Sequence, residues 1–338
     1  MIERKRELDF LVNAAKNKKN AVLLGPSYSG KTTILKSFIE KNKDISVYCN
    51  LSFIGITPEE LALQIIARTA HAIHKKDAFE KYLDFEFLQT LQLGKASDSI
   101  RTIVNELQKI KPDQKLMLET AWRFPSIVAQ QEKKHIVVVI DEFHELLDLN
   151  NYDQVKDIGS IIAQKHPSVS YIFSGMSLPG TETLISDFER ATVQPLTIEE
   201  TKTLTKLSDA EVNKLYTCTN GNPYLTTMLL KRYSQSIEKT LQQEKEFISL
   251  YCSHIYTDLL SRSRGRTLLM NIMQVLSLHT GLRLSELSRK IYRQAPVTKS
   301  LLTRLLDVGL IEAKQGVYDI TDKTMKQWLA QIAKGEQP

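Results

Sequence analysis

Eight consecutive residues near the N-terminus have the types and spacing of a phosphate-binding loop. They match the pattern GxxxxGK(S/T) and are Gly25, Pro26, Ser27, Tyr28, Ser29, Gly30, Lys31 and Thr32. The glycines let the backbone turn its amide groups toward phosphate oxygens, and the N-terminus of a following helix adds a favourable dipole. Lys31 is expected at the β- and γ-phosphates and Thr32 at a magnesium ion, with Thr33 beside them. The motif predicts binding of ATP with Mg²⁺.

Two acidic residues at the end of an apolar run form the second chemical feature. Residues 135–141 read as a buried strand that ends at Asp141, and Glu142 follows directly. Asp141 is expected to hold magnesium, and Glu142 to orient and polarise the water that attacks the γ-phosphate. The alternative is an ordinary strand that ends in two solvated acids. Together with the phosphate-binding loop, the pair favours ATP hydrolysis over binding alone.

Two further polar residues are candidates for catalysis. Ser174 ends the next predicted strand, where it could sense the γ-phosphate or hold the attacking water, or simply cap the following loop. Arg190 could stabilise transition-state charge in a neighbouring subunit as an arginine finger. The alternative for Arg190 is a surface residue paired with Glu189 or Asp187.

The elements that must position these residues alternate between strands and helices. Strands are predicted at residues 20–25, 45–50, 135–141, 169–174 and 191–194. Thr57 and Pro58 start a helix as N-cap and first helical residue, and the pattern stays mostly helical to about residue 131. This alternation predicts an α/β domain with a parallel sheet over residues 1–195, a P-loop ATPase core.

Beyond residue 195 the pattern becomes helical. Capping boxes at Thr197 and Ser208 and a break at residues 221–223 predict a small helical lid over residues 196–252. Residues 253–338 show helices near 267–279, 285–292 and 297–308, then a hairpin with Gly316 at its tip. Three helices and a hairpin predict a winged helix-turn-helix, the alternative being a helical bundle with an incidental hairpin.

Composition excludes several classes of protein. With 42% hydrophobic and 25% charged residues, the chain does not have a disordered or collagen-like composition. No apolar run approaches the roughly 20 residues that cross a bilayer, and the N-terminal residues lack the apolar segment of a signal peptide. The protein is therefore expected in the cytoplasm, without a membrane partner.

The positive charge is confined to the end of the chain. Residues 253–338 contain 13 Lys and Arg against 7 Asp and Glu, which accounts for the whole net charge of +6. Double-stranded DNA is therefore the expected partner of this region, with Arg262, Arg264 and Arg266 as a flexible basic approach. The alternative is a solvated face on a module that contacts protein. The residues expected to contact DNA are Thr298, Lys299, Ser300, Thr303, Arg304 and Lys314.

Taken together, these motifs resemble the AAA+/STAND-related P-loop ATPases, in particular the archaeal and bacterial group with a C-terminal winged helix, similar in layout to origin-recognition initiators. Residues 2–11 look like the N-terminal box of that family, residues 141–146 like its Walker B end, and residues 220–225 like its GNP signature. The resemblance implies that Arg4 and Pro223 border the nucleotide and that Ser174 is sensor 1. The chain departs from the family in a helical insertion at residues 70–130, and the lid shows no clear sensor 2 arginine, with Arg232 as a candidate.

The leading hypothesis is an ATP-driven switch that engages DNA through its C-terminal module and self-associates when ATP binds, as an initiator or transposition regulator would. A second hypothesis is a STAND-type signalling or defence NTPase whose winged helix makes intramolecular or protein contacts. A third, a small-molecule kinase, is disfavoured because the sequence shows no separate substrate cleft.

Overall fold

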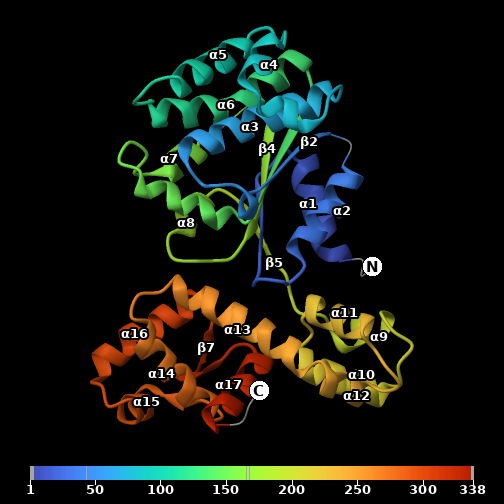
Figure 1. Cartoon of the computed structure of the whole chain (residues 1–338), viewed down its shortest axis with the longest axis vertical. Coiled ribbons are helices and arrows are strands. Elements are labelled where there is room, and N and C mark those ends of the chain that lie inside the picture. Colours follow the sequence, from blue (N-terminus) through green and yellow to red (C-terminus); the bar gives the residue numbers. More distant parts are fainter. Residues whose placement is uncertain (1–3, 43, 165, 167, 336–338) are drawn as a thin grey trace.

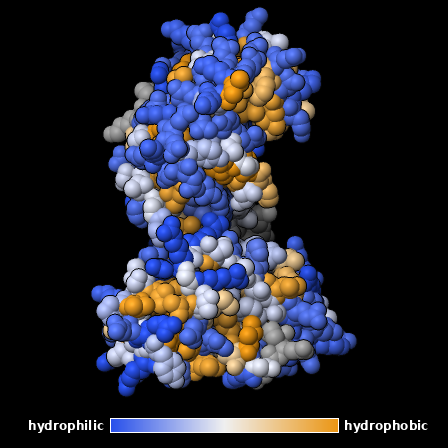
Figure 2. Space-filling view, turned by 60° about the vertical axis from the view of Figure 1, so that its left-hand side comes forward, coloured by the Kyte–Doolittle hydropathy of each residue, from blue (hydrophilic) through white to orange (hydrophobic). Residues whose placement is uncertain are grey.

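The computed structural model describes residues 4–42, 44–164, 166 and 168–335, and these form two halves joined at a narrow waist (Figures 1 and 2). We call residues 4–195 the core half and residues 196–335 the C-terminal half. Figure 2 shows that hydrophilic side chains predominate on the visible face of both halves, with scattered apolar patches. None of the helices in the described residues is both long enough and apolar enough to span a membrane.

A parallel sheet of five strands in the described residues forms the centre of the core half, as predicted. The spatial order is β2-β3-β4-β1-β5, and the strands are β1 (Ala21–Leu24), β2 (Ile45–Asn50), β3 (Ile136–Asp141), β4 (Val169–Gly175) and β5 (Glu189–Thr192). β5 begins two residues earlier than expected. The register pairs Asp141 with Ser174 and Leu24 with Gly175. The carboxyl ends of β1, β3 and β4 therefore meet at one edge, where α/β folds bind ligands.

Different helices cover the two faces of the sheet, because successive side chains on a strand point to opposite sides. Leu23 and Val139 pack with the first pair of helices, whereas Val22 and Val138 pack with the second group. The first pair is α1 (Lys5–Lys16) and α2 (Lys31–Lys41). The second group is α3 (Pro58–His74), α6 (Gln114–Glu132), α7 (Ile158–Ile162) and α8 (Thr181–Leu184). Short 3₁₀ helices follow β2 and β3, namely η1 (Leu51–Phe53) and η3 (Phe143–Asn151).

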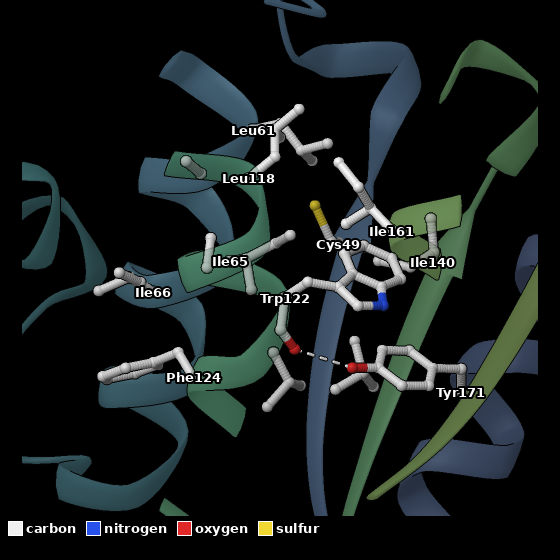
Figure 3. Packing of buried hydrophobic residues seen from close by; sticks show 14 of the residues in the cluster. Cys49, Leu61, Ile65, Ile66, Leu118, Trp122, Phe124, Ile140, Ile161 and Tyr171 are labelled. Carbon is white, nitrogen blue, oxygen red and sulfur yellow. Dashed lines mark hydrogen bonds between the residues drawn. The ribbon is translucent and has the colours of Figure 1, made fainter. Parts of the chain in front are cut away.

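The helical insertion is part of the core rather than an appended domain. Trp122 of α6 stacks on Tyr171 of β4 with ring centroids 4.9 Å apart, and the Tyr171 hydroxyl donates to the Trp122 carbonyl over 3.0 Å (Figure 3). Both side chains are buried. The segment around Trp122, which had no assignment from sequence, therefore anchors the insertion to the sheet. The other insertion helices are η2 (Phe79–Leu83), α4 (Phe85–Thr90) and α5 (Ala96–Leu107).

The C-terminal half begins with the two predicted capping boxes. Thr197 accepts a hydrogen bond from the Glu200 amide, and the Glu200 carboxylate accepts one from the Thr197 amide; Ser208 and Glu211 do the same. Each box satisfies two amides that a helix start otherwise leaves unpaired. The helices are α9 (Ile198–Thr203), α10 (Asp209–Thr219), α11 (Pro223–Lys231), α12 (Ile237–Gln243) and α13 (Lys245–Ser261).

The last part of the chain contains the three predicted helices and the predicted hairpin. Gln315 and Gly316 have φ of 52° and 78° at the hairpin tip, the positive values that tight hairpin turns require. Two elements had no sequence prediction: a short strand that pairs with the hairpin and a final helix. The elements are α14 (Arg266–Ser277), β6 (Leu282–Arg283), α15 (Leu284–Lys290), α16 (Ala295–Asp307), β7 (Ile311–Lys314), β8 (Val317–Ile320) and α17 (Lys323–Ala333).

One hydrophobic cluster runs through the whole C-terminal half. It contains Leu225 of α11 together with Leu305 of α16, and Met176 of the core half joins it. α17 returns to α13, where the Trp328 indole donates to the Ser249 hydroxyl over 2.9 Å. The expected division at residue 252 falls within α13, so the helical segment and the last module share this helix and a common core.

Candidate functional site

A cavity of about 1680 Å³ lies between the two halves, at the carboxyl edge of the sheet. Cavities that hold small ligands have volumes of roughly 300–1,000 Å³, so this one is open enough for a nucleotide to enter. Its core wall includes residues 27, 28 and 30–32 of the phosphate-binding loop, together with Glu142, His144 and Glu145 after β3. Its opposite wall comes from α11 and α13 and includes Pro223, Tyr224, His254, Asp258 and Arg262.

The phosphate-binding loop has a backbone that its glycines make possible. A Cβ on Gly25 would lie 2.9 Å from the Ser29 hydroxyl and 3.2 Å from Val193, and Gly30 has a φ of 94° directly before α2. Tyr28, which has a side chain, also adopts a positive φ of 61°. The loop therefore curls tightly over the start of α2, whose first amides have no partner within the helix.

Lys31 is almost fully buried and folds back over this loop. Its ammonium donates to the carbonyls of Gly25 and Pro26 over 3.1 and 2.9 Å, and lies 3.7 Å from the Glu142 carboxylate. Burial lowers the pKa of Lys31, an effect that Glu142 and Asp141 oppose by favouring the charged form. The cation thus lies inside the loop that the sequence assigns to phosphate.

Asp141 is the centre of a hydrogen-bond network at the end of β3. Thr32 donates to its Oδ2 over 2.6 Å, Tyr48 donates to the same oxygen over 3.0 Å, and Ser174 donates to Oδ1. Tyr48 and Asn50 are two residues apart on β2 and so point to the same side, where the Asn50 amide lies 3.5 Å from Oδ2. The predicted metal ligands Asp141 and Thr32 are therefore adjacent. Sequence reasoning missed Tyr48 and Asn50, although their spacing at a strand end was a usable signal.

Glu142 leaves the strand in a left-handed conformation, with φ 59° and ψ 46°. This conformation is uncommon for a residue with a side chain and turns the carboxylate into the cavity beside Lys31. Burial raises the pKa of Glu142, and the carboxylates of Asp141 and Glu145 add to the rise while Lys31 opposes it. A carboxylate with a raised pKa next to a phosphate-binding loop has the properties of a general base.

Three residues that sequence reasoning did not assign to this site continue the network across the cavity. His144 is buried, with Nδ1 3.5 Å from Glu142 and Nε2 3.4 Å from Glu145. Arg262, at the end of α13, lies 3.1 Å from the same Glu145 carboxylate oxygen. Arg262 was expected in a flexible basic segment facing DNA; instead it is held against the core half, so that part of the prediction is wrong.

Two buried polar atoms near the cavity have no hydrogen-bond partner in the described structure. They are one terminal nitrogen of Arg4 and the hydroxyl of Ser29. The Arg4 side chain is only 9% exposed and reaches the cavity from the start of α1. Such groups cost free energy unless a ligand or water pairs with them. Ile2 and Glu3, the first residues of the expected N-terminal box, lie outside the described residues.

The C-terminal half reaches the phosphate-binding loop through Pro223 and an aromatic cluster. A Cβ on Gly30 would lie 3.7 Å from the Pro223 ring. Tyr28 packs on Tyr224 and Tyr251, with ring centroids 4.8 and 5.7 Å away. Within the core half, the Ser27 hydroxyl lies 3.5 Å from the sulfur of Met176, which joins the hydrophobic cluster of the C-terminal half. Thr33 is exposed on the next turn and lines the same cavity.

Two predicted arginines lie away from this cavity. Arg190 of β5 pairs with Glu182 over 2.6 Å and donates to the Ile185 carbonyl, rather than pairing with Glu189 or Asp187. Arg232, the sensor 2 candidate, pairs with Glu244 over 2.6 Å and stacks on Phe247. Within one chain, neither contributes to the walls of the cavity.

The residues expected to contact DNA divide into two groups. Lys299, Ser300 and Thr303 are exposed on α16, and Lys314 is exposed next to the hairpin tip. The expectation for Thr298 is wrong, because this residue is fully buried and its hydroxyl donates to the Gln294 carbonyl over 3.1 Å.

Arg304 is the second residue expected to contact DNA whose side chain is instead bonded within the chain. Its guanidinium donates to the Arg264 carbonyl over 2.9 Å, so it fastens α16 to the segment between α13 and α14.

Comparison with known proteins agrees with this fold. The structure is similar to that of a Walker-type ATPase of Pyrococcus abyssi, with a TM-score of 0.72 and 16% sequence identity. The match covers 97% of this chain and 96% of the Pyrococcus abyssi chain. The ORC2 protein of Aeropyrum pernix, solved as ADPNP-ADP complexes, gives a TM-score of 0.58 with 10% identity over 99% and 95%. A search of curated protein sequences gave no significant match. Residues 1–229 match the model of an ATPase domain found predominantly in Archaea, and the chain therefore belongs to this family of P-loop ATPases.

Proposed function

We propose that the protein is an ATP-hydrolysing switch whose nucleotide lies between its two halves. The observation that carries the proposal is that Lys31, Thr32 and Glu142 line one cavity, which Arg4, with its unpaired nitrogen, also lines. Asp141 is buried directly behind Thr32 and accepts its hydrogen bond. The structural neighbour from Aeropyrum pernix that holds ADPNP and ADP supports nucleotide binding.

Each residue of the site has a role in this proposal. The amides of residues 25–32 and the Lys31 ammonium bind the phosphates, and Ser29 pairs its free hydroxyl with the ligand. Thr32 and Asp141 offer the hydroxyl and carboxylate oxygens that suit Mg²⁺, which when bound neutralises charge on the phosphate oxygens. Glu142 accepts a proton from the attacking water, while Ser174 orients Asp141. Arg4 and Pro223 border the rest of the nucleotide.

Two substitutions separate binding from hydrolysis. Lys31→Ala should abolish binding of a fluorescent ATP analogue, because it removes the cation at the phosphates. Glu142→Gln should keep binding and lose turnover, because the amide cannot take up the proton. Glu132→Gln serves as the matched control for the charge change, since it makes the same substitution at an exposed residue at the end of α6, away from the cavity. Normal turnover by Glu142→Gln would refute the assignment of the base.

We further propose that residues 1–195 are the ATPase core, residues 196–252 a helical lid, and residues 253–338 a winged helix module that binds double-stranded DNA. Support comes from three helices and a small sheet, in which the hairpin that follows them pairs with β6 from between the first two helices, and from a charge excess located in this module. In this arrangement α16 enters the major groove and the hairpin contacts the adjacent backbone. The exposed residues Lys299, Ser300, Thr303 and Lys314 would make these contacts.

DNA binding is tested with the full chain by electrophoretic mobility shift over a salt series. Lys299→Glu with Lys314→Glu should weaken binding about tenfold or more and flatten the salt dependence. Lys16→Glu with Lys134→Glu, the same charge change on exposed residues of the core half, should leave both unchanged. Absence of binding at low salt would favour the STAND-type alternative, in which the module contacts protein.

Self-association on ATP binding and a cytoplasmic role as an initiator or transposition regulator complete the proposal. In an oligomer, the exposed Arg190 would exchange Glu182 for the γ-phosphate of a neighbouring subunit. Sedimentation with and without ATP tests this step. An unchanged monomer would remove the role proposed for Arg190.

A further inference from the structure

A continuous set of charged and polar contacts joins the end of α13 to Glu142 across the cavity. Arg262 lies 3.1 Å from Glu145, and Asp258 steadies the same guanidinium from one turn earlier, at 3.3 Å. Glu145 is in turn 3.4 Å from His144, which is 3.5 Å from Glu142. Arg262 is the residue of the C-terminal half that contacts the core half in this set.

The hydrogen bonds around His144 determine which ring nitrogen carries the proton. The backbone amide of Met176 donates to Nδ1 over 3.3 Å, so Nδ1 is an acceptor and the proton lies on Nε2. Nε2 therefore donates toward Glu145, the residue that Arg262 holds. The imidazole, only 3% exposed, is thus fixed on one side by the residue after β4 and on the other by Glu145, which Arg262 holds.

The pairing of Arg262 with Glu145 affects Glu142 because of the charges that surround the Glu142 carboxylate. Glu142 is surrounded by Lys31 of α2, Asp141 of β3, and both His144 and Glu145 of η3. Glu145 repels the Glu142 carboxylate unless a cation compensates its charge, and Arg262 is the cation in contact with it. Arg262 also disfavours a positive charge on His144, which keeps the imidazole from forming an ion pair with Glu142.

Resting on the proposed function, we propose that Arg262 is a positioning residue for Glu142, supplied by the C-terminal half and acting through the charge of Glu145. When α13 is docked on the core half, Glu142 is directed at the phosphate-binding loop. When α13 moves away, Glu145 loses the cation that compensates its charge, and its repulsion turns the Glu142 carboxylate away from that direction. Hydrolysis thereby depends on the docking of the C-terminal half.

The same segment is connected to the proposed DNA-binding helix. Arg304 of α16 donates to the Arg264 carbonyl, and it lies 3.3 Å from where a Cβ on Gly265 would be. Gly265 has a φ of 86°, so the turn between α13 and α14 depends on this residue. A movement of α16 is therefore transmitted to Arg262 through only two intervening residues, Arg264 and Ser263.

The kinetic test compares Arg262→Ala with Arg264→Ala, which removes an exposed arginine two residues along and keeps the carbonyl that Arg304 uses. Arg262→Ala should lower kcat about 10- to 100-fold while KM for ATP changes less than about threefold, as expected for loss of a residue that orients a catalytic group. Arg262→Lys should recover part of kcat. Equal kcat in the two alanine variants, or a change confined to KM, would overturn the proposal.

A double substitution tests whether Arg262 acts through Glu145. Glu145→Gln keeps an acceptor for His144 and removes the uncompensated charge, so adding Arg262→Ala to it should cost far less than Arg262→Ala costs alone. Additive losses would show that Arg262 acts elsewhere, for example on the nucleotide itself.

A third measurement does not depend on turnover. In nucleotide-free protein, hydrogen exchange of the amides in η3 should be faster in Arg262→Ala than in wild type, and unchanged in Arg264→Ala. If wild-type protein fails to hydrolyse ATP, the proposed function fails, and the exchange result then decides alone whether Arg262 orders η3. Identical exchange in all three proteins would overturn the proposal.

Discussion

The hydroxyl of Ser174 donates a hydrogen bond to Oδ1 of Asp141, and both side chains are completely buried. The bond joins the ends of two neighbouring strands, because the register of β3 and β4 places these residues side by side. The oxygen of Asp141 that faces Thr32 is thereby fixed in direction.

Ser174→Ala should therefore weaken the apparent affinity for Mg²⁺ by about 10- to 100-fold, the usual effect of removing a group that orients a metal ligand. A magnesium titration of ATP turnover measures this shift. Ser170→Ala provides the control, since Ser170 lies on the same strand but bonds to His135 instead. Equal magnesium dependence in the two variants would contradict the role assigned to Ser174.

Trp122 should contribute more to stability than any surface residue of the insertion. Its side chain is 1% exposed, and it stacks on Tyr171. Trp122→Ala should lower the free energy of unfolding by about 3–5 kcal/mol, through lost burial and a residual cavity. Trp122→Phe should cost less, because the indole nitrogen has no partner in the described structure and its removal relieves an unpaired donor. Urea denaturation followed by circular dichroism distinguishes the two.

The folded protein should become less stable as the pH is lowered, because of His144. Burial, with smaller effects of Arg262 and Lys31, lowers the pKa of His144 to about 3, whereas an unfolded histidine has a pKa of about 6.5. Between these values the unfolded chain binds a proton that the folded protein does not, so stability decreases as the pH falls from 6.5 toward 3. At pH 5 the loss from this residue is about 2 kcal/mol.

His144→Gln should remove that part of the pH dependence, which urea denaturation at pH 7.5 and pH 5 would reveal as a smaller difference than in wild type. An identical difference in the two proteins would mean that His144 becomes protonated in the folded state.

Gly221 should be intolerant of any side chain. Its φ is 71°, and an added Cβ would lie 2.3 Å from the Leu196 carbonyl oxygen. Gly309 has a similar φ of 73° with no heavy atom within 4 Å of that position. Gly309→Ala should therefore cost about 1–2 kcal/mol, the penalty of the left-handed conformation alone. Gly221→Ala should cost more in urea denaturation, and equal values would show that the backbone of Leu196 yields freely.

Local sequence signals predicted much of the fold and the core wall of the site. The capping boxes at Thr197 and Ser208, the phosphate-binding loop and the strand that ends at Asp141 each depend on residues close in sequence. β6 was missed because a two-residue strand has no periodicity and exists only through its pairing with β8. α17 was not assigned either, although its Asp322 N-cap and apolar spacing are visible in the sequence.

The other wall of the site could not be predicted in the same way. Arg262 was interpreted from its basic neighbours, but its position is decided by Glu145, a residue more than a hundred positions earlier. Thr298 was placed on an exposed helix face, whereas tertiary packing buries it. Charge composition identified which region is basic without showing which of its cations are already paired within the chain.

The polypeptide crosses between the two halves once in the described residues, where β5 gives way to α9. A force that separates the halves therefore passes through this single segment and through the few side chains that bridge the cavity, among them Arg262 and Tyr28. A ligand held by both walls would carry part of that load. A nucleotide bound by both walls would then resist separation of the halves, and the stiffness of the molecule would depend on which nucleotide is bound.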